Sequence, residues 1–203
     1  MFPIYKQLKL ERKNIYFVIG VSVVFCSLSA GFSLVGTVLP DKIALVNPIE
    51  HGSLSIKEIG GHFIWGAVAA IVTLRVRYIL LGGLFAVLID SDHLIGLLHT
   101  EGIPRMGHSI TFAIIATIVL MLVFSKKDYR LGTIVGTSVL THISYDIFDG
   151  SYGFPILTPF MDKIIQLPRT DWIVFEIAAI VTIGISSFII TKKESVQKNT
   201  SAQ

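Results

Sequence analysis

The stretch Ile15–Leu39 restricts the fold of this chain more than any other feature, because it runs for 25 residues without a charged side chain. About 20 consecutive apolar residues are enough to cross the hydrocarbon core of a bilayer. Basic residues precede the stretch, as they also do in a secretory signal peptide. The apolar part of a signal peptide is only about 7–15 residues long, so we predict an uncleaved membrane helix.

Five more apolar stretches follow the first, and the chain is 52% hydrophobic but only 15% charged. A soluble domain carries about 25% charged residues, so we expect lipid as the solvent. The second and third stretches are short for a full crossing, and a helical hairpin that does not fully cross is the alternative. We predict an all-α fold, a polytopic membrane helical bundle of about six transmembrane helices. The five later stretches are Gly61–Leu74, Tyr78–Ile89, Ser109–Phe124, Leu131–Phe148 and Trp172–Ile190.

The basic residues predict the orientation of these helices. With six crossings and both termini in the cytoplasm, 12 Lys and Arg residues fall on the inner side and 5 on the outer side, as the positive-inside rule requires. The net charge of +3 is thereby explained by orientation and does not indicate nucleic acid. The outer five are Lys42, Lys57, Arg105, Lys163 and Arg169.

The chain divides into three parts on this interpretation. Residues 1–14 form a basic cytoplasmic N-terminus, and residues 15–190 form a single membrane domain. Residues 191–203 form a polar cytoplasmic tail, which we expect to be disordered. The single cysteine, Cys26, excludes an internal disulfide and suits a small buried apolar side chain.

All six histidines and most carboxylates fall on the outer side in this topology. Several stand at the outer ends of predicted helices, at one depth, where ionisable groups are costly and indicate function. The histidines are His51, His62, His93, His99, His108 and His142.

Two short motifs carry metal-ligand residue types. His142 and Asp146 are four residues apart, which places them on one face of a helix. They could bind one metal, or the carboxylate could orient the imidazole. The run Asp90-Ser91-Asp92-His93 offers three ligands, although it could also be a polar helix end. Two aspartates at a helix C-terminus are unfavourable for the helix dipole, which favours a compensating cation.

Three more segments complete the pattern. Ser109 is a candidate N-cap, which places His108 at the mouth of the fourth helix. Arg105 is either an interface anchor or a binding group for an anion such as phosphate. His62 opens the second span as an interface residue or a ligand. Glycines and prolines in 149–160 favour an ordered loop that forms one wall of a pocket.

These motifs resemble the YdjM-like family of LexA-regulated, inner-membrane metal-dependent hydrolases. The resemblance covers residues 61–160 and rests on four segments in the family order. Two departures stand out: Ile89 replaces a proline, and the Arg105 segment lacks the leading His and the Thr of the family pattern. The order of ligands is also similar to that of zinc-dependent phospholipase C and a group of multi-zinc nucleases. The segments are His62 with Gly66, Asp90 to His93, Arg105 to Ser109, and His142 to Asp146 continuing to Phe160.

The resemblance implies a metal-dependent hydrolase in the inner membrane. The predicted topology places its site at the outer face, at the depth of the headgroups, which favours a phosphoester or lipid-linked substrate. The resemblance also implies a divalent metal, with Zn²⁺ favoured by mixed imidazole and carboxylate ligands and Mn²⁺ or Fe²⁺ as alternatives. Asp90 is expected to be a further ligand or the catalytic base, and Arg105 to bind phosphate. The expected ligands are His62, Asp92, His108, His142 and Asp146.

Two non-enzymatic functions stay open. A metal or proton transporter could use His142, Asp146 and Glu176, but a transporter carries ionisable groups to mid-membrane depth. The inner halves of the predicted spans are almost uncharged. A structural membrane protein, whose polar ends only pack together, would bind no metal.

Overall fold

The apolar stretches fold as helices, because a helix satisfies its own backbone hydrogen bonds where water is absent. The computed structural model describes residues 12–36, 55–98, 105–151, 153–161 and 163–200. Within them the chain is almost entirely helical, which confirms the predicted all-α class. The α-helices are α2 (Arg12–Gly36), α3 (Ile56–Ala70), α4 (Val76–Leu88), α5 (Ile110–Phe124), α6 (Tyr129–Asp149) and α7 (Trp172–Thr200).

Short elements join these helices. Leu74, with a φ of 53°, reverses the chain between the 3₁₀ turn η1 (Ile71–Thr73) and α4. Past α4, a 3₁₀ segment η2 carries the Asp90 motif, and a turn η3 precedes α5. Two short antiparallel strands and a turn η4 connect α6 to α7. Their bounds are η2 (Ile89–Leu98), η3 (Met106–His108), β1 (Gly153–Phe154), β2 (Ile165–Gln166) and η4 (Arg169–Asp171).

Side chains define where the helices begin. Ser109 caps α5 by accepting a hydrogen bond from the backbone N–H of Phe112, as the sequence predicts. Ser55 caps α3 and Asp128 caps α6 in the same way. Each cap satisfies a backbone donor that the first helical turn leaves unpaired. The caps fix where the polar side chains of the first turns lie.

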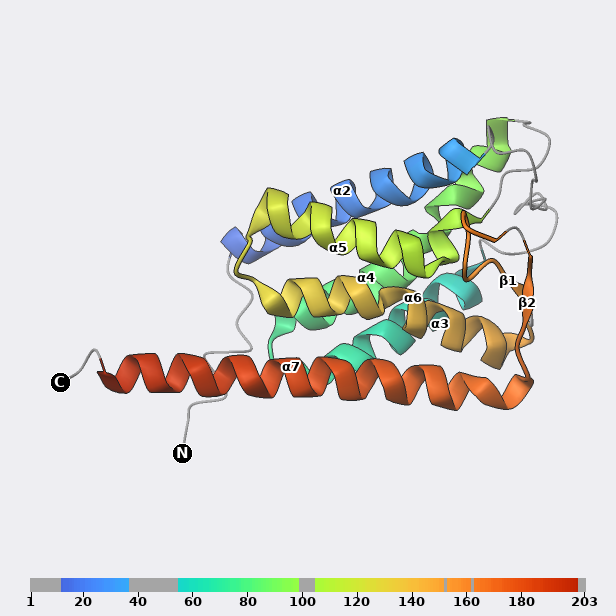
Figure 1. The fold of residues 1–203 in the computed structure, drawn as a ribbon. Helices are drawn as coiled ribbons and strands as arrows, with labels where there is room; N and C mark the ends of the chain where they lie inside the picture. Colours follow the sequence, from blue (N-terminus) through green and yellow to red (C-terminus); the bar gives the residue numbers. More distant parts are fainter. Residues whose placement is uncertain (1–11, 37–54, 99–104, 152, 162, 201–203) are drawn as a thin grey trace.

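The helices lie side by side, and α7 is the longest of them (Figure 1). Helices α3 and α4 pack most closely, because glycines face each other where they cross. A Cβ atom on Gly66 would lie 2.2 Å from the carbonyl oxygen of Gly82. The family-like spacing of His62 and Gly66 therefore has a packing reason, since Gly66 lets the His62 turn approach α4.

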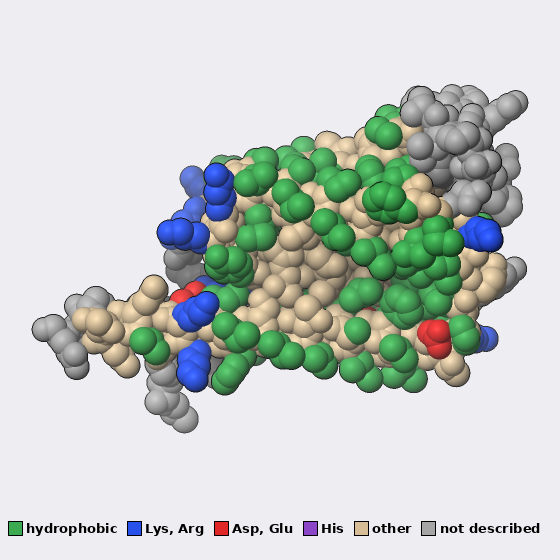
Figure 2. All heavy atoms as spheres, viewed as in Figure 1, with side chains coloured by type: hydrophobic (Ala, Val, Ile, Leu, Met, Phe, Trp, Pro, Cys, Tyr) green, Lys and Arg blue, Asp and Glu red, His purple; other side chains and the backbone are tan. Residues whose placement is uncertain are grey.

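The core between the helices is aromatic and aliphatic. Phe25 of α2 stacks on Phe85 of α4 at 4.4 Å and meets the edge of Phe112 of α5. Large apolar side chains also cover the outside of α5 and α7, and Figure 2 shows them along the length of the molecule. An apolar exterior over an apolar core is expected of helices solvated by lipid.

Two helices are long and apolar enough to cross a membrane, namely α2 and the stretch Arg169–Gln197, and α5 is a shorter apolar helix. Helices α3 and α4 have 15 and 13 residues, which confirms that the second and third stretches are short. Six crossings, and the cytoplasmic location of both termini, stay predictions.

The expected disorder of the C-terminal tail is wrong, because α7 continues through it to Thr200. Glu194 explains the extension. Its carboxylate accepts hydrogen bonds from Arg130 at 2.7 Å and from Arg75 at 3.0 Å, which fastens the tail to the bundle.

Candidate metal centre

Four elements bring ligand-type side chains to one end of the bundle. α3 contributes His62, η2 contributes the Asp90 motif, η3 contributes His108, and α6 contributes His142 with Asp146. Serines of α2 hold η2 in place: the hydroxyl of Ser29 donates to the carbonyl of Ile89, which directly precedes Asp90. The side chains of the four histidines and of Asp92 are almost completely buried.

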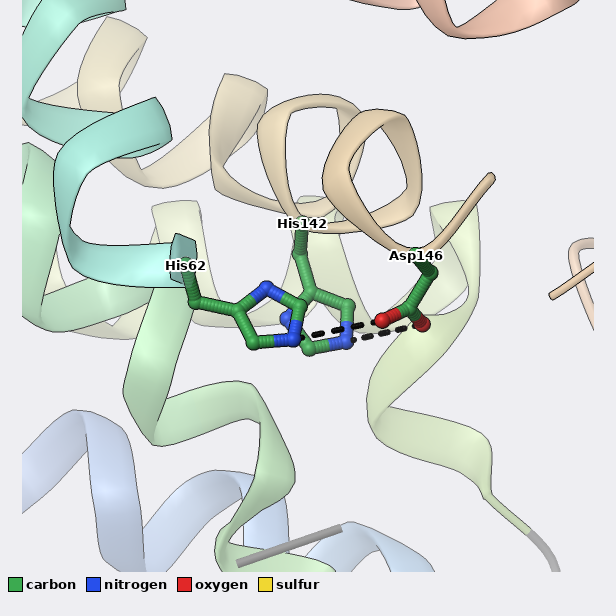
Figure 3. A group of neighbouring side chains, drawn as sticks. All are labelled: His62, His142 and Asp146. Carbon is green, nitrogen blue, oxygen red and sulfur yellow. Dashed lines mark ion pairs between the residues drawn. The ribbon is translucent and has the colours of Figure 1, made fainter. Parts of the chain in front are cut away.

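The first group in this cluster consists of His62, His142 and Asp146 (Figure 3). The two imidazole rings stack with their centroids 4.0 Å apart and nearly parallel. Each ring turns its Nε2 atom toward one oxygen of Asp146, at 3.2 Å for His62 and 3.4 Å for His142. The helical spacing of His142 and Asp146 therefore places both side chains toward the same point, as the sequence predicts.

Asp90 lies at the centre of the cluster. One carboxylate oxygen is 3.5 Å from Nε2 of His62. The other is 3.2 Å from His93, 3.4 Å from His108 and 3.5 Å from His142, measured to Nε2 in each case. A single carboxylate thus faces four imidazoles that come from four elements.

These spacings fit ligand atoms around a cation. Zinc-to-ligand distances of about 2.0–2.1 Å with tetrahedral geometry place neighbouring ligand atoms about 3.3 Å apart. The described residues contain three groups of ligand atoms that lie within 4.8 Å of one another. The groups overlap at Asp90 and His142, so the cluster is continuous. They are His62–His142–Asp146, Asp90–His108–His142 and Asp90–Asp92–His93.

The backbone of α4 sets the tautomer of His142. Its Nδ1 lies 2.6 Å from the carbonyl oxygen of Ala86, which can only accept, so Nδ1 carries the proton. The Nε2 atom then points its lone pair at the cluster, 2.8 Å from Nε2 of His108. A backbone carbonyl that orients a histidine in this way is typical of metal-ligating histidines.

Asp92 is held from the opposite side by α2. The hydroxyl of Ser33 donates to its Oδ2 at 3.1 Å, and Nδ1 of His108 lies 3.8 Å from the same oxygen. Asp92 Oδ1 has no hydrogen-bond partner among the described residues, and the same holds for Nδ1 of His62 and Oδ2 of Asp146. Buried polar atoms without partners are costly, so the donor set fits a bound cation.

Arg105 also points into the cluster. Its guanidinium lies 3.1 Å from Oδ1 of Asp90 and 2.6 Å from Nε2 of His108. Burial lowers the pKa of Arg105 more than any single neighbour raises it, but the charges of Asp90, Asp146 and Asp92 together outweigh burial and raise the pKa above its ordinary value. Arg105 therefore stays a cation beside three carboxylates.

Comparison with known families decides what kind of protein carries this cluster. A model of the YdjM inner membrane protein family matches residues 58–201, which include every residue of the cluster. The chain belongs to the YdjM inner membrane protein family. Its predicted location in the inner membrane is thereby confirmed, and the bilayer is its surroundings. No curated protein and no solved structure matches the chain.

The structure brings together every site residue that the sequence of this YdjM family member predicts. All five expected ligands, together with Asp90 and Arg105, lie in the one cluster. The predicted outer histidines His51 and His99 lie outside the described residues. Metal binding and catalysis by these seven residues stay predictions.

Sequence reasoning missed one member of the cluster and one residue that supports it. His93 was one of three candidates in its motif but not an expected ligand, and its Nε2 is 3.2 Å from Asp90. The three-residue spacing from Asp90, one helical turn, is the signal that could have found it. The supporting residue is Ser33 of α2, whose hydroxyl donates to Asp92, and the four-residue spacing of Ser29 and Ser33 on one helix face is the signal that could have found it.

Polar residues surround the rim of the cluster. A carboxylate oxygen of Glu58 lies 4.0 Å from Nε2 of His62. Lys57 forms an ion pair with Asp149, at the end of α6. The ring of Tyr145 packs against His62 with an edge-on geometry at 4.6 Å. The predicted loop after α6 is ordered as the β1–β2 hairpin.

Proposed function

We propose that this protein is a membrane-bound, metal-dependent hydrolase with a phosphoester or lipid-linked substrate. The position of Asp90 carries the proposal, since its carboxylate lies 3.2–3.5 Å from the Nε2 atoms of four histidines. The buried carboxylates of Asp92 and Asp146 and the partly buried carboxylate of Asp90 converge with these imidazoles, and a single guanidinium among the described residues, that of Arg105, balances them. Divalent cations would supply the missing positive charge.

The cluster is large enough to divide between two cation positions. His62, His142 and Asp146 would hold one, and Asp92 with His93 would hold the other. Asp90 would be a ligand shared by both, rather than the base that the sequence left as an alternative. His108 lies between them, because its Nε2 faces Asp90 and His142 while its Nδ1 faces Asp92. Mixed nitrogen and oxygen ligation favours Zn²⁺, with Mn²⁺ or Fe²⁺ as alternatives.

Bound divalent cations would polarise the scissile group and make a water molecule nucleophilic near neutral pH. The side chains of this chain would do the rest. Arg105 would bind phosphate oxygens through its planar guanidinium, which forms paired hydrogen bonds that lysine does not. Glu58, at the rim beside His62, would accept the proton of the attacking water.

The side chains of α6 support a transport function less well than they support a hydrolase. Between Arg130 and His142 this helix has no ionisable side chain. The hydroxyls of Thr137, Ser138 and Thr141 donate to carbonyls of their own helix, so they offer no path for ions or protons. A transporter needs such groups at mid-membrane depth.

Elemental mass spectrometry on protein purified in mild detergent tests the proposal. We expect one or two equivalents of Zn or Mn in the natural protein and almost none in the double variant His142→Ala/Asp146→Ala. The matched control is Asp149→Ala, one turn further along α6 and outside the cluster, which should keep the metal. Glu58→Gln should keep the metal and lose hydrolysis of phosphoester substrates.

Two results would contradict the proposal. One is the absence of metal from the natural protein even after reconstitution with Zn²⁺ or Mn²⁺. The other is an unchanged metal content in the double variant when both proteins have the same helical circular dichroism.

A further inference from the structure

The β1–β2 loop, Pro155 to Ile164, exposes apolar side chains beside the cluster although it is not a helix. Phe160 is 83% exposed, and Leu157, Met161 and Ile164 are exposed to lesser degrees. Residue 162 lies outside the described residues. Exposed apolar groups gathered on one short loop indicate a surface that contacts something other than water.

The loop is ordered, because its other side is anchored. Residues 154–156 and Thr158 are buried, while Leu157, Pro159 and Phe160 are exposed. The carbonyl of Ile156 accepts a hydrogen bond of 2.9 Å from the backbone N–H of Ile110, the first residue of α5. The backbone N–H groups of Phe160 and Met161 both donate to the carbonyl of Leu157, which closes the tip into a turn.

The anchoring ties the loop to two ligand-bearing elements. Ile110 follows His108 by two residues, and β1 begins four residues after the end of α6, which carries His142 and Asp146. The exposed tip is therefore attached to the same end of the bundle as the cluster.

The apolar tip continues the lipid-facing surface of the bundle. Exposed Ile110 and Ile114 of α5 lead toward the loop, as do exposed Ile173 and Ile177 of α7. Figure 2 shows hydrophobic side chains along this face up to the end where Figure 1 draws the hairpin. Lys163 in the loop and Arg169 just after it are exposed. Basic side chains beside apolar ones suit the headgroup level of a membrane, where they reach the phosphates.

We propose that the β1–β2 loop inserts its tip among the acyl chains of the adjacent leaflet and guides an amphiphilic substrate to the cluster. The anionic headgroup would reach Arg105 and the ligand residues while its chain stays in the bilayer beside Phe160 and Met161. The second half of this proposal rests on the proposed hydrolase function, whereas membrane insertion of the loop does not.

Fluorescence quenching in lipid nanodiscs tests the insertion. The full-length protein with Cys26→Ser receives either Phe160→Cys or Val196→Cys, and each cysteine carries an environment-sensitive nitrobenzoxadiazole label. Val196 is an exposed apolar residue in the C-terminal part of α7, beyond Glu194, and is the matched control. The nanodiscs contain phosphatidylethanolamine and phosphatidylglycerol, with or without a nitroxide at the fifth acyl carbon.

We expect the nitroxide lipid to quench the label at position 160 at least twofold and to leave the label at 196 nearly unchanged. A label at 160 with water-like emission and no quenching would overturn the insertion. Blue-shifted emission without quenching by the nitroxide would indicate that a protein surface, such as a second copy of this chain, covers the loop, and would overturn it as well.

Hydrolysis by Phe160→Ser/Met161→Ser tests the guidance of substrate. The ratio of activity on a long-chain lipid phosphoester in nanodiscs to activity on a water-soluble short-chain phosphoester should fall about tenfold. The matched control Leu122→Ser/Val123→Ser changes two lipid-facing residues at the far end of α5 and should keep the ratio. Equal losses on both substrates would overturn the guidance. If the natural protein hydrolyses neither substrate, the hydrolase function fails while the quenching result still decides the insertion.

Discussion

The two ends of the bundle hold similar numbers of buried or partly buried charges in opposite arrangements. At the end away from the cluster, Arg130 and Arg75 donate to Glu194, while Tyr78 and Arg77 donate to Asp128. Figure 2 shows that lysines and arginines gather at this end. Both carboxylates that the structure describes here, Glu194 and Asp128, accept hydrogen bonds from arginine or tyrosine side chains, so this basic end stabilises the fold without an added ion.

At the cluster end, the described carboxylates outnumber the arginine side chains. Asp90, Asp92 and Asp146 meet four imidazoles and one guanidinium, and several of their atoms lack a hydrogen-bond partner among the described residues. The charged groups of the basic end therefore pair with one another, whereas the cluster end has more carboxylates than cationic side chains among the described residues, an imbalance that the proposed cations would offset. Buried charges that pair with one another do not indicate a binding site. Buried carboxylates and imidazoles that face one another do indicate one.

Asp90→Asn should have the largest effect, because it removes the carboxylate that all four histidines face. We expect metal affinity to fall by more than about 100-fold, above the range for residues that only support a ligand. Isothermal titration of metal-stripped protein with Zn²⁺ measures it. The control Asp128→Asn changes the carboxylate of the basic end and should leave the affinity within about twofold. A similar loss in both variants would mean that the two ends do not differ as argued.

Arg130→Gln should have the next largest effect, on stability rather than on metal. The side chain of Arg130 is buried and donates to both Glu194 and Thr191. Hydrogen bonds to charged groups contribute about 1.5–3 kcal/mol each, and Arg75 still pairs with Glu194, so we expect a loss of about 2 kcal/mol. Thermal unfolding in detergent should show a lower Tm with an unchanged metal content. Lys192→Gln, an exposed change on the same helix, is the control. A loss of metal from Arg130→Gln would mean that a change at the basic end affects metal binding at the cluster end, which contradicts the independence of the two ends.

Much of the cluster was predictable because its residues stand at helix ends in a repeated polar pattern. The spacing of His142 and Asp146 fixes a common helix face, and Ser109 fixes the start of α5 behind His108. Placing these helix ends at the same depth in the membrane was enough to predict that their side chains form one cluster. The short second and third helices were predictable from the charges that bound them.

Contacts between distant segments were not predictable from such patterns. The approach of α3 to α4 depends on Gly66 meeting Gly82, which no local spacing reveals. The carbonyl of Ala86 that orients His142 has no side-chain signature. The helical tail depends on Glu194 meeting Arg130, which lies 64 residues earlier. Polarity alone therefore indicated disorder where tertiary ion pairs extend the helix.

Ser33→Ala should have the smallest effect, and it tests how far the cluster end depends on support from α2. The Ser33 hydroxyl donates to Asp92 and also accepts from the backbone N–H of Gly107, at 3.4 Å. Residues that hold a ligand in place typically contribute about 10–100-fold to metal affinity. Asp92 belongs to only one of the three ligand groups, so we expect about tenfold, at the low end of that range.

Titration of Ser33→Ala with Zn²⁺ should show this loss in one binding step if two cations bind, with the other step unchanged. The control Ser27→Ala removes a hydroxyl of the same helix that donates only to a carbonyl within it. Equal affinity in the natural protein and in Ser33→Ala would mean that Asp92 needs no support or binds no cation. Ser33→Ala combined with Asp92→Asn separates these two explanations. If Asp92 is a ligand, the combined variant loses the same binding step completely. Its Tm should stay close to that of the natural protein, because the ion pair of Arg130 with Glu194 at the basic end is unchanged.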